Sequence, residues 1–283
     1  MKIFSAVLFL LHWLNATAQI NFPRASPACS ITQTVGLTDI TIDYCRPGTK
    51  GRKIFGEIVP YGRIWRVGAN ESTKMTITQP IKINNHQLPA GTYALYAIPQ
   101  ADNWTMVVHR NITHWGDGRD DYDANEDAFR FEVKVKTLKK MVEDFTIDFQ
   151  NLTHSNTDII LAWENTLVSF TITVDTRKQV LAEIQEKLKE PTADTYYQAA
   201  RYFQEEGLEP QQALEWLDSA LALAGDTYYI HRVKSLIQAE LGNYADAIQS
   251  AKQSLSLAAG QNKDEFVRMN QKNISKWEAL IKP

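Results

Sequence analysis

The sequence predicts an α+β protein of two domains, in which an antiparallel β-sandwich is followed by a short all-α helical array. Two observations lead to this prediction. Apolar side chains alternate with polar ones up to about residue 174, and after Asp175 they recur at the three-to-four-residue spacing of amphipathic helices. The helical half also contains an internal repeat. The change of period near residue 175 sets the expected domain boundary.

Composition agrees with a globular protein. The chain has 283 residues, of which 44% are hydrophobic and 10% aromatic, so there is enough apolar material for one or two domains. The 13 Gly and 10 Pro are too few for a collagen-like or disordered chain. The net charge of -3 argues against general nucleic-acid binding, because phosphate contacts need a positive surface.

The first residues have the pattern of a secretory signal peptide. Lys2 precedes an apolar run over 3–14, and the small residues Ala16-Thr17-Ala18 follow. This run is too short for a membrane span of about 20 residues, and we expect no transmembrane segment in the mature chain. We therefore predict a signal peptide over 1–18, cleavage after Ala18, and a periplasmic or secreted protein.

The β-sandwich domain is expected over 23–175. Phe129, Phe131, Val133 and Val135 alternate with charged residues, as half-buried strands do. Further short runs with turn formers between them are typical of an antiparallel sandwich. The expected strands are 30–35, 40–44, 74–78, 81–83, 93–98, 104–109, 129–135, 145–150, 158–163 and 167–174.

Export would place Cys29 and Cys45 in an oxidising compartment, where two thiols form a disulfide if geometry allows. If 30–35 and 40–44 pair as a hairpin with their apolar faces turned to one core, the two cysteines point to opposite sides. A bridge would then need a bulge or a strand that ends early. The sequence leaves a Cys29–Cys45 disulfide and two free thiols equally open.

The helical array is expected over 176–283. Ala213 and Ala247 are 34 residues apart, and Leu214 and Ile248 share this offset. A helix-pair repeat of about 34 residues is the tetratricopeptide length, and the stretch 241–248 resembles the helix-turn-helix centre of that family. We expect two such units and a capping helix over 264–281. The alternative is an unrelated helical bundle.

Several motifs of the β half, taken in order, resemble an exported family known as domain of unknown function 2911. The resemblance covers roughly 23–175 and implies an exported protein of the type found in Bacteroidetes, in which some members carry tetratricopeptide-like tails. It implies no reaction. The motifs are Pro23-Arg24-Ala25-Ser26-Pro27, Gln33-Thr34-Val35-Gly36, Tyr44-Cys45-Arg46-Pro47, Lys50-Gly51-Arg52-Lys53-Ile54-Phe55-Gly56, Val59-Pro60-Tyr61-Gly62, Trp65-Arg66-Val67-Gly68-Ala69-Asn70-Glu71, Leu88-Pro89-Ala90-Gly91-Thr92-Tyr93 and the stretch from Trp104 to Trp115.

A basic, glycine-rich stretch over 46–66 is the main candidate for ligand binding. It has six Lys and Arg residues and one acid, Glu57. Arginine forks bind carboxylate or phosphate, and aromatic faces stack on sugar rings. The alternative is that these arginines pair with acidic neighbours and hold long loops in place. The candidate residues are Arg52, Lys53, Tyr61, Trp65, Arg66, Asn70, Glu71 and Trp115.

The sequence leaves open whether the protein is an enzyme. A cleft that joins Arg66, Glu71 and His109 would suit a hydrolase of cell-envelope sugars or esters, and Glu71 and His109 are the candidate catalytic residues. An Arg66–Glu71 ion pair is the structural alternative.

We expect no metal and no cofactor. Asp121, Asp123, Asn125, Asp127 and Glu132 match the spacing of a calcium loop, but position 6 is Glu126 instead of Gly and a strand follows. His109 and His114 are near each other in sequence, but zinc needs three or four convergent ligands and neither thiol is suitably spaced.

The leading functional hypothesis is an exported noncatalytic binding protein. In this hypothesis the β half binds a small anionic or glycan-like ligand, and the helical repeats contact an unknown envelope protein. The alternative is the cell-envelope hydrolase.

Overall fold

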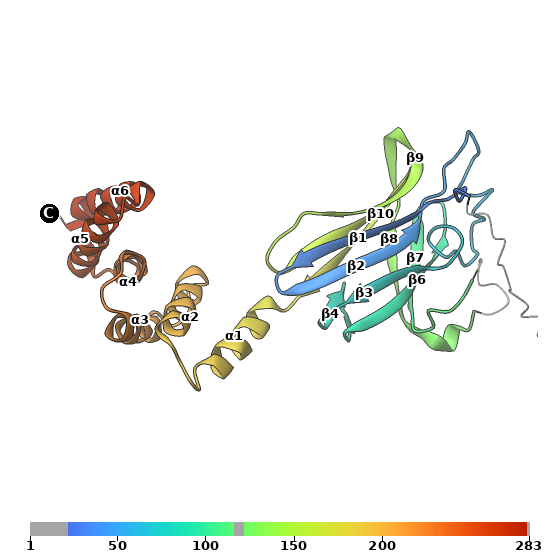
Figure 1. The fold of residues 1–283 in the computed structure, drawn as a ribbon. Helices are drawn as coiled ribbons and strands as arrows, with labels where there is room; N and C mark the ends of the chain where they lie inside the picture. Colours follow the sequence, from blue (N-terminus) through green and yellow to red (C-terminus); the bar gives the residue numbers. More distant parts are fainter. Residues whose placement is uncertain (1–21, 116–121, 282–283) are drawn as a thin grey trace, which may run out of the picture. The chain divides into compact units, whose positions relative to one another are not determined.

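The computed structural model describes residues 22–115 and 122–281, and the chain divides into two units between Thr176 and Arg177 (Figure 1). The two units are described separately below. The predicted signal peptide and Asp121 of the calcium-like pattern lie outside the described residues.

The first unit contains a six-stranded antiparallel sheet with the order β1-β2-β3-β6-β7-β8. The predicted hairpin over 30–35 and 40–44 is confirmed, because β1 and β2 pair from Ala28–Cys45 to Val35–Thr38. The strands are β1 Ala28–Val35, β2 Thr38–Cys45, β3 Thr73–Ile77, β6 Gly91–Pro99, β7 Asn103–His109 and β8 Asp127–Lys134.

A second antiparallel sheet has the order β5-β4-β10-β9. The sequence does not predict the short strand β5, and the two predicted strands 158–163 and 167–174 form one long strand, β10. Its pairing with β9 shifts register between Ala162 and Thr166, which is why the alternation breaks there. The strands are β4 Ile81–Ile83, β5 His86–Leu88, β9 Lys136–Gln150 and β10 Asn156–Val174.

The core of the first unit lies between the two sheets, whose layers are visible in Figure 1. As the alternation predicts, Phe131 and Val133 are buried while Arg130 and Glu132 are exposed. Aromatic rings at the centre make edge-to-face contacts that add to the hydrophobic effect. These rings belong to Phe55, Trp65, Trp104, Phe145 and Trp163.

A tyrosine hydroxyl joins the two sheets inside this core. Tyr44 of β2 donates to the carbonyl of Ile147 on β9 at 3.3 Å and accepts from the Ile147 amide at 3.1 Å. Burial, partly offset by this contact with Ile147, raises the pKa of Tyr44 to about 12. The hydroxyl satisfies two backbone groups at a depth where water cannot replace it.

Both cysteines are free thiols in the structure. Cys29 is paired with Tyr44 in the hairpin, and Cys45 is paired with Ala28, so the two cysteines occupy neighbouring positions of opposite orientation. The Cys45 thiol accepts a hydrogen bond from Asn70 at 3.4 Å. The hairpin therefore keeps the regular register in which a Cys29–Cys45 bridge does not form.

The turn between β1 and β2 is tight and buried on one side. Gly36 has a φ of 58°, and a Cβ at this position would lie 1.9 Å from the Thr176 hydroxyl oxygen. That hydroxyl donates to the carbonyl of His154 at 2.5 Å. The position therefore requires glycine both for its backbone angle and for its space.

The second unit is a helical array, as predicted. Helices α2 and α3 pack together, as do α4 and α5, and α6 packs on α5. Ala213 and Ala247, the repeat positions, are fully buried at these helix contacts. The helices are α1 Thr176–Lys187, α2 Ala193–Glu205, α3 Pro210–Ala224, α4 Tyr228–Glu240, α5 Tyr244–Gly260 and α6 Asp264–Ile281.

Local sequence explains where these helices begin and how they are held. Thr192 and Thr227 cap α2 and α4 by accepting from backbone amides in the first turn. In the interior, buried Asn270 donates to the hydroxyl of Ser254, which donates to the carbonyl of Tyr228. None of the described helices is long and apolar enough to cross a membrane.

Candidate functional site

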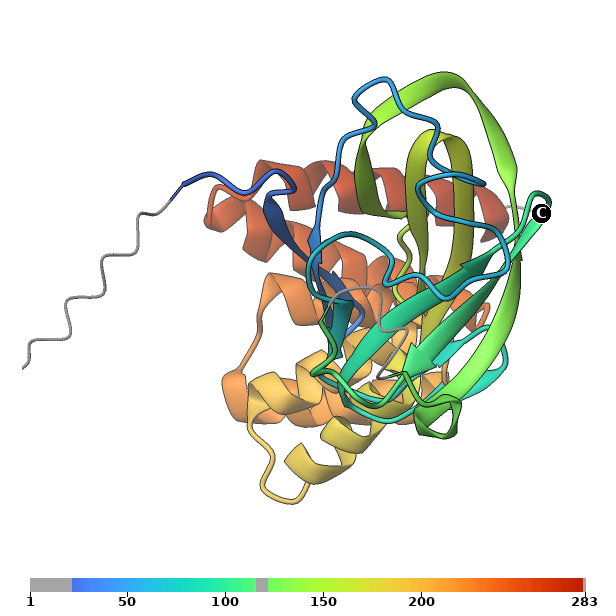
Figure 2. The same cartoon turned by 90° about the vertical axis from the view of Figure 1, so that its right-hand side faces the viewer.

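The long connection between β2 and β3, residues 46–72, contains most of the predicted ligand-binding residues and is drawn in blue in Figure 2. Two arginines of this connection hold the loop in place through hydrogen bonds to backbone carbonyls. Arg46 donates to the carbonyl of Phe145, and Arg52 donates to the carbonyls of Gly48 and Thr49. Glu143 accepts from Thr49 and from the Lys50 amide, and these hydrogen bonds hold its pKa below the ordinary value.

Three arginines of this connection line one cavity of about 400 Å³. Arg52 and Arg66 are among the predicted ligand residues, whereas Arg63 is a member that the sequence did not single out. None of the described residues that line this cavity is Asp or Glu. We call it the arginine cavity.

Trp65 lies on the wall of the arginine cavity but belongs mainly to the core. Its side chain is 6% exposed, its indole nitrogen donates to the Gly68 carbonyl at 3.1 Å, and its ring contacts Trp163. The ring face is therefore occupied by other aromatic rings. The prediction that Trp65 offers a face for sugar stacking has no support from this geometry.

A strained backbone follows the tryptophan. Val67 is fully buried and has a φ of 55°, a region that β-branched residues avoid. The Thr73 hydroxyl donates to its carbonyl at 2.5 Å, and Gly68 follows with a φ of 150°. Strain of this kind costs about 1–3 kcal/mol and concentrates at functional positions. The strained residue directly follows Arg66, which lines the arginine cavity.

The other predicted ligand residues do not line the arginine cavity. Lys53, Tyr61 and Trp115 are exposed. The Asn70 amide is engaged in structural contacts, because it donates to the Ser26 carbonyl at 3.3 Å and to the Cys45 thiol. Of the predicted ligand-binding residues, Arg52, Trp65 and Arg66 line the arginine cavity together, and the other five do not.

Glu71 lines a different cavity, of about 500 Å³, together with Lys74 and His114. Its carboxylate lies 3.6 Å from Arg24, and both side chains are largely exposed. Arg66 lines the arginine cavity instead, and the His109 side chain has no exposed surface. The three residues of the predicted hydrolase cleft are thus not lining residues of one cavity.

A second group of polar side chains lies around His109, at the end of β7. The Asp127 carboxylate is 2.9 Å from Nδ1 of His109, and it also accepts from Tyr122 at 2.7 Å and from Arg130 at 2.6 Å. The Tyr122 ring stacks on the imidazole with ring centres 5.0 Å apart. Burial and the hydrogen bond to Asp127 raise the pKa of Tyr122 above its ordinary value.

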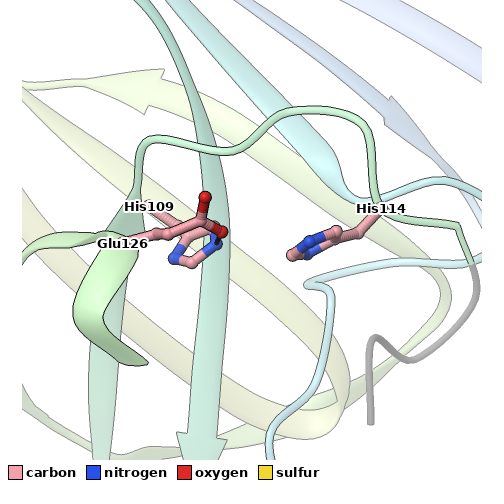
Figure 3. A group of neighbouring side chains, drawn as sticks. All are labelled: His109, His114 and Glu126. Atoms are coloured by element: carbon pink, nitrogen blue, oxygen red, sulfur yellow. Dashed lines mark ion pairs between the residues drawn. The ribbon is translucent and has the colours of Figure 1, made fainter. Parts of the chain in front are cut away.

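His114 and Glu126 complete this group, and Figure 3 shows their side chains directed toward His109. One ring nitrogen of each histidine and one carboxylate oxygen of Glu126 all lie within 4.8 Å of one another. Nδ1 of His114 is 3.1 Å from the hydroxyl of Tyr96, and the Glu126 carboxylate accepts from Asn111 at 3.1 Å. We call these three residues the histidine cluster.

Sequence reasoning paired the two histidines but missed Glu126 as their third neighbour. Glu126 ends a short 3-10 helix, Ala124–Glu126, just before β8, and β8 pairs with the strand that contains His109. In the sequence it stood at position 6 of the calcium-like pattern. Two other members of that pattern have structural partners, since Asp123 caps the 3-10 helix and Asp127 contacts His109. The expectation that the protein binds no metal remains untested.

Comparison with known families assigns the β half. Residues 26–172, more than half of the chain, match a family described as protein of unknown function (DUF2911). No curated protein and no solved structure matches the chain. The matched range spans both sheets and includes the arginine cavity and the histidine cluster. The chain therefore belongs to the DUF2911 family.

Proposed function

We propose that the DUF2911 domain of this protein binds a small anionic ligand in the arginine cavity. One observation carries the proposal: Arg52, Arg63 and Arg66 line the same cavity, and no described carboxylate lines it with them. Guanidinium groups are always charged and donate in a fork that matches carboxylate and phosphate. Arg52 also donates to the carbonyls of Gly48 and Thr49, but the described lining residues place no second anion in the cavity to repel the ligand.

The rest of the cavity wall favours a ligand with a compact apolar part. Ile58, Pro60 and Trp163 lie on it beside the arginines. The buried tryptophan rings leave little aromatic surface for sugar stacking, so the anionic part of the original hypothesis has better support than the glycan part. The hydrolase alternative has less support, because Glu71 and Arg66 line different cavities.

The test is a titration of the full chain with inorganic phosphate, citrate and glucuronate, followed by calorimetry and by thermal melting. Arg63→Ala and Arg66→Ala should each weaken the tightest of these about 10–100-fold, since a hydrogen bond to a charged group contributes about 1.5–3 kcal/mol. Arg268→Ala, at an exposed position of α6, is the control. Equal affinity in all four proteins, or no binding of any of the three anions, would refute the proposal.

We also propose that the helical half contacts another protein and that its helix pairs are tetratricopeptide-like. The support is the pairwise packing at a 34-residue offset and the 62% exposed Leu223 at the end of α3. A photo-crosslinking residue at position 223 should yield one defined adduct in the native host, whereas the same residue at exposed Glu215 should not. Export remains part of this proposal, and N-terminal sequencing of the mature protein should begin at Gln19.

A further inference from the structure

The histidine cluster contains a buried nitrogen whose bonding is incomplete. Nε2 of His109 has no hydrogen-bond partner among the described residues, although the side chain is fully buried. Oε2 of Glu126 lies 3.5 Å from this nitrogen. A buried polar atom without a partner costs free energy, so such an atom calls for an explanation.

The contact on the opposite side of the ring fixes which tautomer a neutral His109 adopts. Asp127 already accepts from Tyr122 and Arg130, and a carboxylate can only accept, so Nδ1 of His109 must be the donor toward Asp127. A neutral imidazole then has its lone pair on Nε2. This lone pair and the Glu126 carboxylate are two acceptors 3.5 Å apart, and no donor among the described residues bonds to Nε2.

We propose that Nε2 of His109, a ring nitrogen of His114 and a carboxylate oxygen of Glu126 bind one divalent transition-metal ion of the zinc class. Two imidazoles and one carboxylate are borderline donors that suit Zn²⁺ and Co²⁺, whereas Ca²⁺ and Mg²⁺ prefer sites made of oxygen alone. A cation bound between these groups would accept the lone pair of Nε2 of His109 and a lone pair of the Glu126 carboxylate. The buried nitrogen would then have a bonding partner.

The geometry is close to that of a bound site. Ligand atoms about 2.1 Å from a tetrahedral Zn²⁺ are about 3.4 Å from one another, and the three atoms of the cluster lie within 4.8 Å. His109 is held rigidly, while the Glu126 side chain is 42% exposed. A shift of Glu126 and His114 on the order of 1 Å therefore closes the site to the bond lengths that zinc requires.

Each ligand also has an outer partner that orients it. Asp127 holds His109, the Tyr96 hydroxyl holds His114, and Asn111 holds Glu126. A histidine ligand whose second nitrogen donates to a carboxylate is the usual arrangement around protein-bound zinc, because it fixes the tautomer and raises ligand basicity. The three ligands supply three of the four positions of a tetrahedral ion.

The experiment uses the untagged full chain, because an affinity tag of histidines would itself bind metal. The protein is stripped with EDTA and dialysed, then titrated with ZnCl₂ by calorimetry and with CoCl₂ by visible absorption. One equivalent of Zn²⁺ should bind and raise the melting temperature, Co²⁺ should give the bands of a tetrahedral site, and CaCl₂ should have no effect.

The variants are Glu126→Gln and His114→Ala, with His154→Ala and Glu57→Gln as matched controls at exposed positions. Loss of an outer partner already lowers metal affinity about 10–100-fold, so loss of a ligand should lower it at least as much. The controls should bind like the wild type. Glu126→Gln changes one half-exposed group and keeps the shape, and melting of the metal-free proteins shows that each variant is folded.

Three results would overturn the proposal. These are no binding of Zn²⁺ by the wild type, binding that survives unchanged in both Glu126→Gln and His114→Ala, and calcium binding as tight as zinc binding. If the wild type does not bind Zn²⁺, a proton on Nε2 of His109 that is directed at the Glu126 carboxylate would explain instead why the two groups lie close together.

Discussion

Replacing Tyr44 with phenylalanine removes one oxygen atom from between the two sheets. The hydroxyl bonds both the amide and the carbonyl of Ile147, whose side chain is 2% exposed. The ring stays and leaves no cavity, so the cost is that of buried backbone groups without a partner, about 1–3 kcal/mol. For a domain of about 150 residues each kcal/mol lowers the melting temperature by about 2–4 °C.

Urea unfolding followed by tryptophan fluorescence measures this cost, since Trp65, Trp104 and Trp163 all report on the same core. The midpoint should fall while the slope of the transition stays constant. Tyr61→Phe, at a side chain that is 44% exposed, is the control and should change stability little. Tyr44→Phe with the stability of the wild type would show that the two sheets do not depend on this bond.

Four further predictions follow from the structure. Burial raises the folded-state pKa of Tyr44 to about 12, so its stabilising contribution is complete below about pH 10 and is lost as the pH rises through 12. The stability advantage of the wild type over Tyr44→Phe in denaturant melts should therefore fall over that range. Gly36→Ala should lower the melting temperature more than Gly225→Ala, because both glycines have a positive φ but only Gly36 has atoms in the space of a Cβ. Asn270→Ala should destabilise the helical half by about 1–3 kcal/mol, seen as an earlier loss of helical circular dichroism, because it leaves Ser254 without a donor. Intact mass after alkylation of the unfolded, unreduced protein should show two modified thiols, Cys29 and Cys45; one bridged species would contradict the hairpin register.

The sequence predicted the fold well where one physical pattern dominates. Alternation over the strand Asp127–Lys134 and helical spacing over Asp264–Ile281 each depend on a single buried face. The short strand His86–Leu88 was not predicted, because three residues are too few to show an alternation of apolar and polar side chains. The long strand β10 was divided in two because its register shifts near Glu164 move side chains to the other face.

The candidate sites were harder to predict, for different reasons. Charge and glycine content pointed to the connection over 46–72, and Arg52 and Arg66 do line one cavity there. The burial of Trp65 was not predicted, because it depends on how the chain turns at the strained residue Val67. Glu126 is brought to the histidines by pairing of β7 with β8, and no local pattern in the sequence encodes that contact.

The strand β9 has 15 residues and forms one edge of its sheet. The part around Phe145 and Ile147 is already bonded to Tyr44, Arg46 and Pro47, whereas its first half would offer a template for pairing with another molecule. Lys136, Lys139 and Lys140 lie exposed along its first half. Two such edges brought together would place like charges side by side, a known defence of natural sheets against self-association. The lysines therefore oppose the pairing of this part of the edge with a second copy of the domain.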